Sequence, residues 1–301
     1  CMHGKIFFIL FSGHIRIVVT SANLVESEWK KLNQMIWYED FSRATQKIES
    51  EFKSQLIQLI DNFGISGQFL HRYDFSTTKA RLVSSIPGSY SGEQMNQYGH
   101  LRLRHVIDEL KQEHGYMDCP VIHYQCSTIG SIRENWIKEF QESADGKADN
   151  SPPKTNRKAA GDNIKPIRII FPSEQAVAGS HFPEGAGLLH LRTKFYESSK
   201  FLRENLFLWE PSCVSRKVLP HSKIMCSSCE DSVNWIYCGS HNLSQAAWGK
   251  LERGSQQLTI SNYEVGVVLP APCYSLSHDI LPFSTTSLPY HQTDKQPYAS
   301  S

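Results

Sequence analysis

The chain has 301 residues, of which 40% are hydrophobic, and its 31 basic and 30 acidic side chains leave a formal net charge of +1. This length and apolar content indicate a soluble globular protein of one large or two ordinary domains. The near balance of charge neither demands nor excludes a polyanionic partner, so a nucleic-acid surface would have to be a local patch. Eight cysteines without regular spacing are expected to be thiols. The longest apolar run, residues 5–11, is far shorter than the roughly 20 residues that span a bilayer, so we expect no membrane span and no signal segment.

A β-hairpin followed by a helix is predicted at the start of the chain. Apolar and β-branched residues fill 6–11 and 15–19, with a Ser-Gly-His turn between the two segments. After Asn23 the apolar residues take helical spacing, and acidic residues occupy the opening turn. Because the chain starts at Cys1, directly on a predicted strand, we expect the natural chain to begin earlier and this first half to lack strands.

Two longer helices, a polar loop and a second hairpin follow. Apolar residues recur at helical spacing over 42–63 and again over 98–114. Residues 143–165 are polar and contain two consecutive prolines, which predicts a flexible loop. The second hairpin has its turn around residues 229–232. Residues 271–301 lose all periodicity and are expected to form an irregular tail.

The most informative feature is an internal repeat. Both copies contain H-x-K, then a β-rich stretch, then S-x-N-L-x-x-x-x-W without a gap. The His-to-Asn separation is 20 residues in the first copy (3 to 23) and 21 in the second (221 to 242). We expect the two tryptophans to pack in the core. The matching positions are His3 and His221, Lys5 and Lys223, Asn23 and Asn242, and Trp29 and Trp248.

Duplication predicts an α/β protein made of two similar halves. We place the first half at residues 1–88 and the second at residues 89–301, because a Pro-Gly pair marks the boundary. Each half is expected to be a mixed β-sheet flanked by helices. Equivalent motifs delivered by equivalent units indicate one shared site at the interface of the halves.

Paired H-x-K segments suit the chemistry of a phosphodiester. Residues two apart on a strand point to the same face, so each histidine lies beside its lysine. Negative charge grows on the phosphate oxygens during substitution, and ammonium and amide groups stabilise it without a metal. One imidazole can attack phosphorus and form a phosphohistidine, while the other protonates the leaving oxygen and then serves as base for water. The set predicts phosphoryl transfer with no cofactor and no metal.

Paired H-x-K…N motifs on a duplicated fold resemble the phospholipase D superfamily. Many members carry an Asp five residues after the Lys, and here those positions are Leu10 and Ser228. The aspartate-free form is similar to the tyrosyl-DNA phosphodiesterase family. So are T-S-A-N-L at 20–24, N-L-S-Q-A-A-W-G at 242–249 and Y-E-V-G at 263–266. The match runs in order from about residue 2 to about residue 270.

The resemblance implies a role for each matching residue, with His3 as nucleophile and His221 as general acid and base. It implies a DNA-repair phosphodiesterase that removes tyrosine or topoisomerase I-derived peptide, and other blocking groups, from DNA 3′ ends. Such an enzyme is expected in the nucleus, and also in the cytoplasm, as a monomer that binds no membrane. The remaining implied residues are Lys5, Lys223, Asn23 and Asn242 on the phosphate, Gln34 and Glu264 as supports of the histidines, and Ser127, Thr128 and Ser244 on the DNA backbone.

Other interpretations stay open. Cys226-x-x-Cys229 with Cys238-x-x-His241 has the ligand types and spacing of a small zinc site, although the first copy has valine and alanine at the last two positions. The chain is otherwise compatible with another phospholipase D-superfamily nuclease or phosphodiesterase, or with a truncated, inactive product that only binds DNA.

Overall fold

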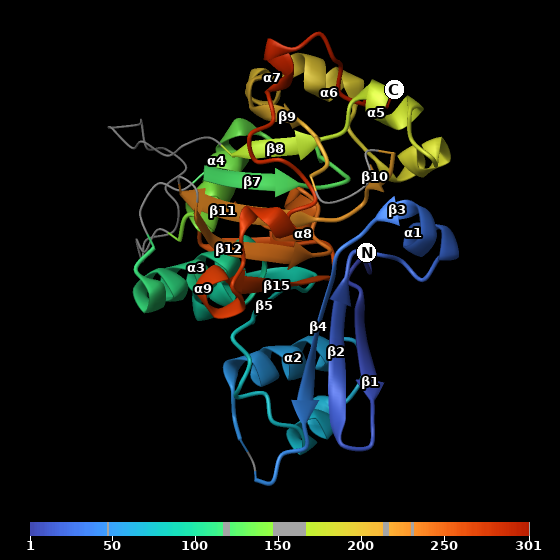
Figure 1. Ribbon diagram of the computed structural model, residues 1–301. Helices are drawn as coiled ribbons and strands as arrows, with labels where there is room; N and C mark the ends of the chain where they lie inside the picture. The colour runs from blue at the N-terminus through green and yellow to red at the C-terminus, as the bar shows by residue number, and fades with distance from the viewer. Residues whose placement is uncertain (47, 117–120, 147–166, 213–216, 230–231, 301) are drawn as a thin grey trace.

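The fold is α/β, as the repeat predicts (Figure 1). A seven-stranded sheet forms the body of the molecule, and a three-stranded sheet built by the beginning of the chain stands beside it. No helix among the described residues is long and apolar enough to cross a membrane. The computed structural model describes residues 1–46, 48–116, 121–146, 167–212, 217–229 and 232–300.

The smaller sheet is the predicted first hairpin extended by one strand. β1 (Ile6–Leu10) and β2 (His14–Thr20) pair antiparallel across the Ser-Gly turn, and β4 (Ile36–Ser42) pairs antiparallel with β2. Ile15, Ile17 and Val19 of β2 point to the face of this sheet that packs on helix α2 (Glu51–Asp61) and belong to the core there. Between β2 and β4 lie α1 (Glu26–Lys31) and the short β3 (Leu32–Asn33).

The large sheet is mixed. Its strand order is β5-β15-β12-β11-β7-β8-β9, with the last three strands parallel and all other neighbours antiparallel. One strand, β5, comes from before the boundary proposed at residue 88. The strands are β5 (Arg81–Ser85), β7 (Val121–Gln125), β8 (Arg168–Phe171), β9 (Leu206–Leu208), β11 (Ile224–Cys229), β12 (Ser232–Gly239) and β15 (Glu264–Pro270).

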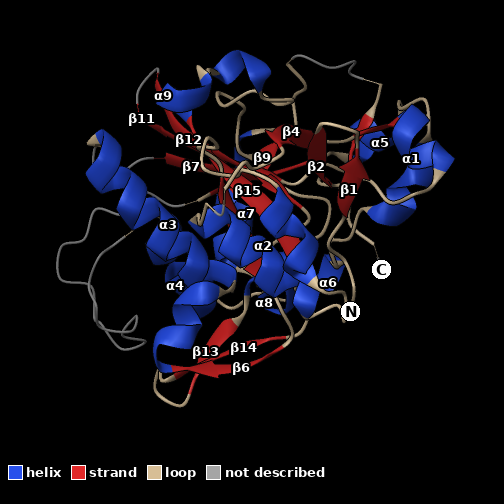
Figure 2. Ribbon diagram, turned by 90° about the horizontal axis from the view of Figure 1, so that it is seen from below, coloured by secondary structure: helices blue, strands red, loops and turns tan. Residues whose placement is uncertain are grey.

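Two apolar cores lie on the two faces of this sheet. The helices α3 (Gly99–His114) and α4 (Glu134–Ala144) cover one face, where Tyr237 and the fully buried Trp248 pack (Figure 2). The other face packs on the three-stranded sheet, α2 and part of the C-terminal segment. Successive residues of β11 and β12 alternate between these cores, which is the two-residue period of a strand buried on both sides.

The C-terminal segment has little regular structure but belongs to the fold. Leu281, Phe283 and Tyr290 are each exposed by no more than 2%, so residues 271–300 contribute to both cores. The other elements are short: α5 (Glu174–Ala178), α6 (Thr193–Ser198), α7 (Lys200–Asn205), α8 (Gln245–Trp248), α9 (Ala271–Tyr274), β6 (Gly88–Ser91), β10 (Leu219–Pro220), β13 (Lys250–Glu252), β14 (Gln257–Ile260), and 3-10 turns at Gly67–Arg72, Gly92–Gln97, Pro183–Leu188, His278–Ile280 and Tyr290–Gln292.

Three local expectations need correction. The helix expected over 42–63 begins only at Glu51: Ser42 is the last residue of β4, and the hydroxyl of Ser50 caps the helix by accepting from the backbone N–H of Lys53. Trp29 is 42% exposed rather than buried, and its indole donates to the carbonyl of Asn23. The loop expected over 143–165 starts later, because α4 continues through Ala144, and residues 147–165 lie outside the described part of the chain.

Each H-x-K motif is anchored on the other copy of the repeat. The backbone N–H groups of His3 and Gly4 both donate to the carbonyl of Tyr263, and those of His221 and Ser222 both donate to the carbonyl of Asn33. β10, which precedes His221, also pairs in parallel with β3 of the first copy. The two histidines therefore come together at the interface that the repeat predicts.

We expect Gly99→Ala to destabilise the fold by about 3 kcal/mol or more, and Gly92→Ala by only about 1 to 2 kcal/mol. Both glycines have φ of +58°, which is strained for any side chain. At Gly99 a methyl group would also overlap the carbonyl oxygen of Trp248, whereas nothing lies within 4 Å at Gly92. Urea unfolding of the two variants separates the steric cost from the backbone cost, and equal losses would contradict close packing at the start of α3.

Candidate active site

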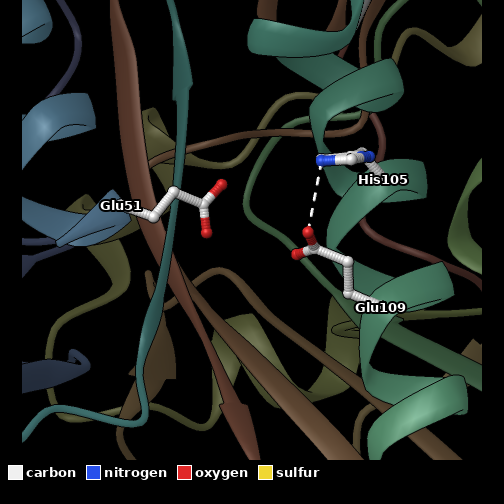
Figure 3. Close-up of side chains that lie close together, drawn as sticks. All are labelled: Glu51, His105 and Glu109. Carbon is white, nitrogen blue, oxygen red and sulfur yellow. Dashed lines mark ion pairs between the residues drawn. The ribbon is translucent and has the colours of Figure 1, made fainter.

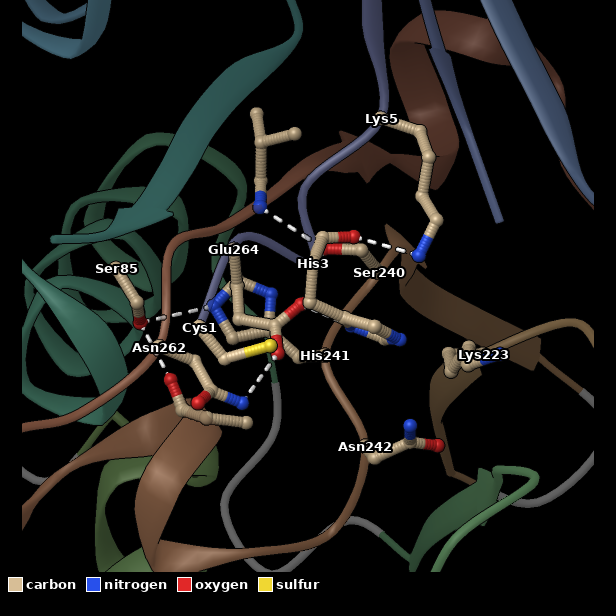
Figure 4. Close-up of polar contacts among 12 residues, drawn as sticks. Cys1, His3, Lys5, Ser85, Lys223, Ser240, His241, Asn242, Asn262 and Glu264 are labelled. Carbon is tan, nitrogen blue, oxygen red and sulfur yellow. Dashed lines mark hydrogen bonds and ion pairs between the residues drawn. The ribbon is translucent and has the colours of Figure 1, made fainter. Parts of the chain in front are cut away.

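The motif residues gather at one edge of the large sheet. β11 begins after Lys223 and β15 begins at Glu264, while the neighbouring β7 and β12 end at this edge because they run in the opposite direction. Asn242 and Thr128 therefore follow strand ends at the place where the two histidine motifs start. Figure 4 shows His3, Lys5, Lys223 and Asn242 around one region of this edge.

His3 is paired with a buried carboxylate. Its Nδ1 lies 2.7 Å from Oε2 of Glu264, whose side chain is 1% exposed (Figure 4). Ser240 donates a hydrogen bond to the same carboxylate oxygen, and Asn262 donates to the other at 3.2 Å. Burial opposes ionisation of Glu264, but the bond from His3, the nearby His241 and the bond from Ser240 lower the pKa of this carboxyl below its usual value. An ionised Glu264 holds the proton of His3 on Nδ1 and leaves Nε2 with a free lone pair.

His221 has an analogous but neutral partner. Its Nδ1 lies 3.1 Å from Oε1 of Gln34, and Ser21 donates to that oxygen at 2.7 Å. The serine of each S-x-N-L motif thus hydrogen-bonds the residue that orients the histidine of the other copy: Ser21 acts through Gln34, and Ser240 through Glu264. The motif pattern predicts a role for the asparagines at the phosphate, but it predicts none for these serines.

The two lysines are held in the same way in both copies. Nζ of Lys5 donates to the carbonyl of His3 at 2.7 Å, and Nζ of Lys223 donates to the carbonyl of His221 at 2.6 Å. Burial, and then the charge of Lys5, lower the pKa of Lys223 to about 7, and burial also lowers the pKa of Lys5. The ammonium groups of the buried Lys223 and the half-buried Lys5 repel each other, so an anion placed between them would be bound strongly.

The two asparagines are oriented differently. Oδ1 of Asn242 accepts hydrogen bonds from the backbone N–H of Thr128 at 3.0 Å and the hydroxyl of Ser127 at 3.3 Å. Its amide nitrogen is thereby left as a donor for a ligand. The side-chain amide of Asn23 instead donates one hydrogen bond to Oε1 of Glu28 at 2.7 Å, which leaves its second amide hydrogen for a ligand.

Two of the three hydroxyls predicted on the DNA backbone already have partners within the protein. Ser127 is 1% exposed and is bonded to Asn242, while the hydroxyl of Ser244 accepts from the backbone N–H of Ala247 and caps α8. A direct contact of these hydroxyls, or that of Thr128, with DNA stays a prediction.

In the free site the second histidine is strongly disposed to be neutral. Burial, followed by the charges of Lys223, Lys5 and His3, lowers the pKa of His221 to about 2. An incoming phosphate anion opposes those positive charges and therefore raises this pKa. An anion bound beside these positive charges would therefore favour the protonated form of His221.

The zinc interpretation does not fit the structure. Cys226 and Cys238 both lie in the apolar core, and burial raises the pKa of each thiol to about 12, which disfavours the thiolate that zinc requires. Both ring nitrogens of His241 are engaged, one by the hydroxyl of Tyr237 and the other by Ser85 at 3.0 Å. The four residues do not assemble as ligands of one ion.

A different group of side chains of the types that bind metals lies on the surface, away from His3 and His221. Glu51, His105 and Glu109 approach one another where α2 meets α3 (Figure 3). Glu51 pairs with the guanidinium of Arg102, and His105 lies 3.3 Å from Glu109. Arg102 already supplies a cation to these carboxylates, so the group is explained as a surface ion-pair network.

Comparison with known proteins agrees with this geometry. A family model described as tyrosyl-DNA phosphodiesterase matches residues 1–300. Tyrosyl-DNA phosphodiesterase 1 of Arabidopsis thaliana is 29% identical over 292 residues, which cover 90% of this chain and 47% of that protein. The corresponding protein of Drosophila melanogaster is 29% identical over 307 residues, which cover 93% of this chain and 51% of that protein. The chain thus spans about half the length of these curated relatives.

Solved structures agree on the fold. A crystal structure of the yeast tyrosyl-DNA phosphodiesterase superimposes with a TM-score of 0.73 and 21% identity, and the match covers 99% of this chain and 77% of that one. The fold and the duplicated motifs define a phospholipase D-like protein. Because the family model matches nearly the whole sequence, the narrower assignment also holds: the chain belongs to the tyrosyl-DNA phosphodiesterase family.

Proposed function

We propose that this protein hydrolyses phosphodiesters at DNA 3′ ends, with a tyrosyl group as the leaving group and without a metal. The observation that carries the proposal is the pair of H-x-K…N motifs, in which each histidine is oriented by a polar residue of the other copy. The names of the relatives support a tyrosyl-DNA substrate. A nuclear location and a topoisomerase I-derived peptide as leaving group follow as parts of the same proposal.

The first step forms a phosphohistidine. Nε2 of His3 attacks phosphorus because the Glu264 carboxylate holds the Nδ1 proton and makes the ring electron-rich. The bond between phosphorus and the tyrosyl oxygen breaks, and that oxygen takes a proton from His221. A carboxylate suits the nucleophile, whereas the neutral amide of Gln34 suits a histidine that must give up its proton.

The second step reverses the proton transfer. His221, now neutral, takes a proton from water, the water oxygen attacks phosphorus, and the bond to Nε2 of His3 breaks. The products are a DNA 3′-phosphate and free tyrosine or peptide. Throughout both steps Lys5, Lys223 and the amide of Asn242 face the phosphate oxygens, where negative charge increases.

The proposed reaction requires no divalent ion, so we expect a 3′-phosphotyrosyl single strand to be cleaved at an unchanged rate in excess chelator. The lysines supply the positive charge that a metal supplies in other phosphodiesterases. Gel analysis of the product also tests the bond that is broken, because the proposal yields a 3′-phosphate.

Three results would contradict this proposal. Loss of cleavage in chelator with recovery in magnesium would show metal dependence. A 3′-hydroxyl as the direct product would show that another bond is cut. Turnover of a choline lipid with no cleavage of the DNA ester would assign a phospholipase instead.

A further inference from the structure

Glu28 is a buried carboxylate beside the proposed general acid. It is 4% exposed, and its Oε2 lies 3.5 Å from Nδ1 of His221. The same carboxylate accepts from the backbone N–H of Asn23 at 2.8 Å and from its amide nitrogen at 2.7 Å. The amide nitrogen of Gln34 approaches it at 3.4 Å. One side chain therefore contacts an asparagine of the phosphate site and both members of the His221 pair.

The duplication does not require this carboxylate. Five residues after Asn23 the first copy has Glu28, whereas five residues after Asn242 the second copy has Ala247. In the second copy Thr128 and Ser127 orient the asparagine instead, and neither contributes a charge. A buried charge is costly unless it balances another charge, so its presence in one copy only indicates a task specific to that copy.

The charges around His221 show what the task is. Lys223 and Lys5 face this histidine and disfavour its protonation, as does His3 whenever it is itself protonated. Gln34 is neutral. Glu264 is bonded to His3, so Glu28 is the carboxylate in contact with His221 among the described residues. Its charge also favours the ammonium forms of Lys5 and Lys223.

We propose that Glu28 is a positioning residue of the reaction, which fixes the amide of Asn23 and supplies the negative charge that lets His221 carry the proton for the leaving oxygen. This inference rests on the proposed function, because it assigns a cause to the proton donation in its first step. The step itself is unchanged: the proton moves from His221 to the tyrosyl oxygen, and Glu28 exchanges none.

Removing the charge has a defined consequence for pH dependence. An opposite charge within about 4 to 6 Å raises the pKa of a cationic acid by roughly 1 to 3 units. Cleavage of a tyrosyl ester needs protonated His221, so its rate falls as pH rises through that pKa. Without Glu28 the pKa is lower, and the fall begins at lower pH.

The test compares Glu28→Gln with the matched control Glu26→Gln, an exposed glutamate on the same helix that pairs with Lys30. Each variant receives a 3′-phosphotyrosyl and a 3′-nitrophenyl phosphate oligonucleotide. For Glu28→Gln we expect the rate of tyrosyl-ester cleavage at pH 7 to fall about 10-fold or more. The falling limb of the pH–rate profile for this ester should move about 1 to 3 pH units lower. The first-turnover release of nitrophenol should change by no more than about 3-fold, because that anion leaves without a proton. Glu28→Asp keeps the charge and should restore the position of the limb.

Each other outcome identifies what is wrong. A Glu28→Gln protein that loses both esters equally, with an unmoved pH limb, would show a merely structural role and overturn the inference. So would unchanged rates on both esters. If the unmodified chain cuts neither ester, the proposed function itself fails. If Glu28→Gln does not fold, the pH–rate profile of Glu28→Asp decides. A falling limb at the pH of the wild-type limb supports the role of the negative charge, and the loss of that limb contradicts it.

Discussion

His3→Ala is expected to abolish cleavage of every 3′ ester, whereas His221→Ala should lose only those whose leaving group needs a proton. Attack on phosphorus requires a nucleophile whatever departs. Protonation matters when the departing oxygen is basic, as in tyrosine, and little when it leaves readily as an anion, as in nitrophenol. We expect His221→Ala to cut the tyrosyl ester about 100-fold or more slowly and still to attack the nitrophenyl ester.

The same variant should trap the intermediate, because His221 is also the proposed base for hydrolysis. Given the nitrophenyl ester, His221→Ala should release one equivalent of nitrophenol and accumulate a covalent DNA adduct. Mass spectrometry of a digest should place the adduct on His3. An adduct on His221 in the His3→Ala protein would reverse the two roles, and no adduct in either would indicate direct attack by water.

Lys223→Met should nearly eliminate turnover and yet make the folded protein more stable. Removing one charge-stabilising group from a preorganised site costs about 100- to 1,000-fold in rate. Lys223 is fully buried beside Lys5, and replacing a buried charge by an apolar side chain of similar volume is often stabilising by about 1 to 4 kcal/mol. The lost hydrogen bond to the carbonyl of His221 offsets about 1 kcal/mol, so we expect a net gain of up to about 3 kcal/mol.

The size of the stability gain from Lys223→Met depends on pH. The pKa of Lys223 is about 7 in the folded protein and about 10.4 in an unfolded chain. Folding must therefore either remove the proton from the ammonium group or bury the charged group, and both cost free energy. The cost is fully present below pH 7 and disappears as pH rises toward about 10. The advantage of Lys223→Met should therefore shrink over that interval.

Urea unfolding at pH 6.5 and pH 9.5 measures this change in stability. Lys200→Met is the matched control, because that lysine side chain is 81% exposed. A stability gain for Lys223→Met that does not depend on pH, or one that Lys200→Met shares, would contradict a buried, pKa-shifted ammonium.

Much of the site was predictable because the motif spacing reflects strand geometry. H-x-K places a histidine and a lysine on one face of an extended segment, and duplication implies two such segments at one interface. The first hairpin and α3 were predictable from local apolar patterns. The supporting role of Glu28 was not, because its only local signal is an acidic residue in the first turn of a helix, which is common for reasons of helix stability.

Features set by contacts between the halves could not be read from local patterns. The pairing of β3 with β10 joins segments far apart in the sequence, and Trp29 is exposed although the equivalent Trp248 is buried, so neither feature follows from the repeat itself. The zinc-like spacing misleads for the same reason: Cys238 and His241 are close in sequence, but the turn after β12 directs the histidine to Tyr237 and Ser85.

The crossed anchoring of the two histidines has a consequence for how this protein acquires activity. His3 and Glu264 are separated by 261 residues, and His221 and Gln34 by 187. Contacts between such distant residues close long loops, and the entropic cost of closing a loop rises with its length. Either half can complete its own hairpin early, yet neither holds an oriented histidine until the other is in place. The two oriented histidines are therefore a property of the docked pair of halves.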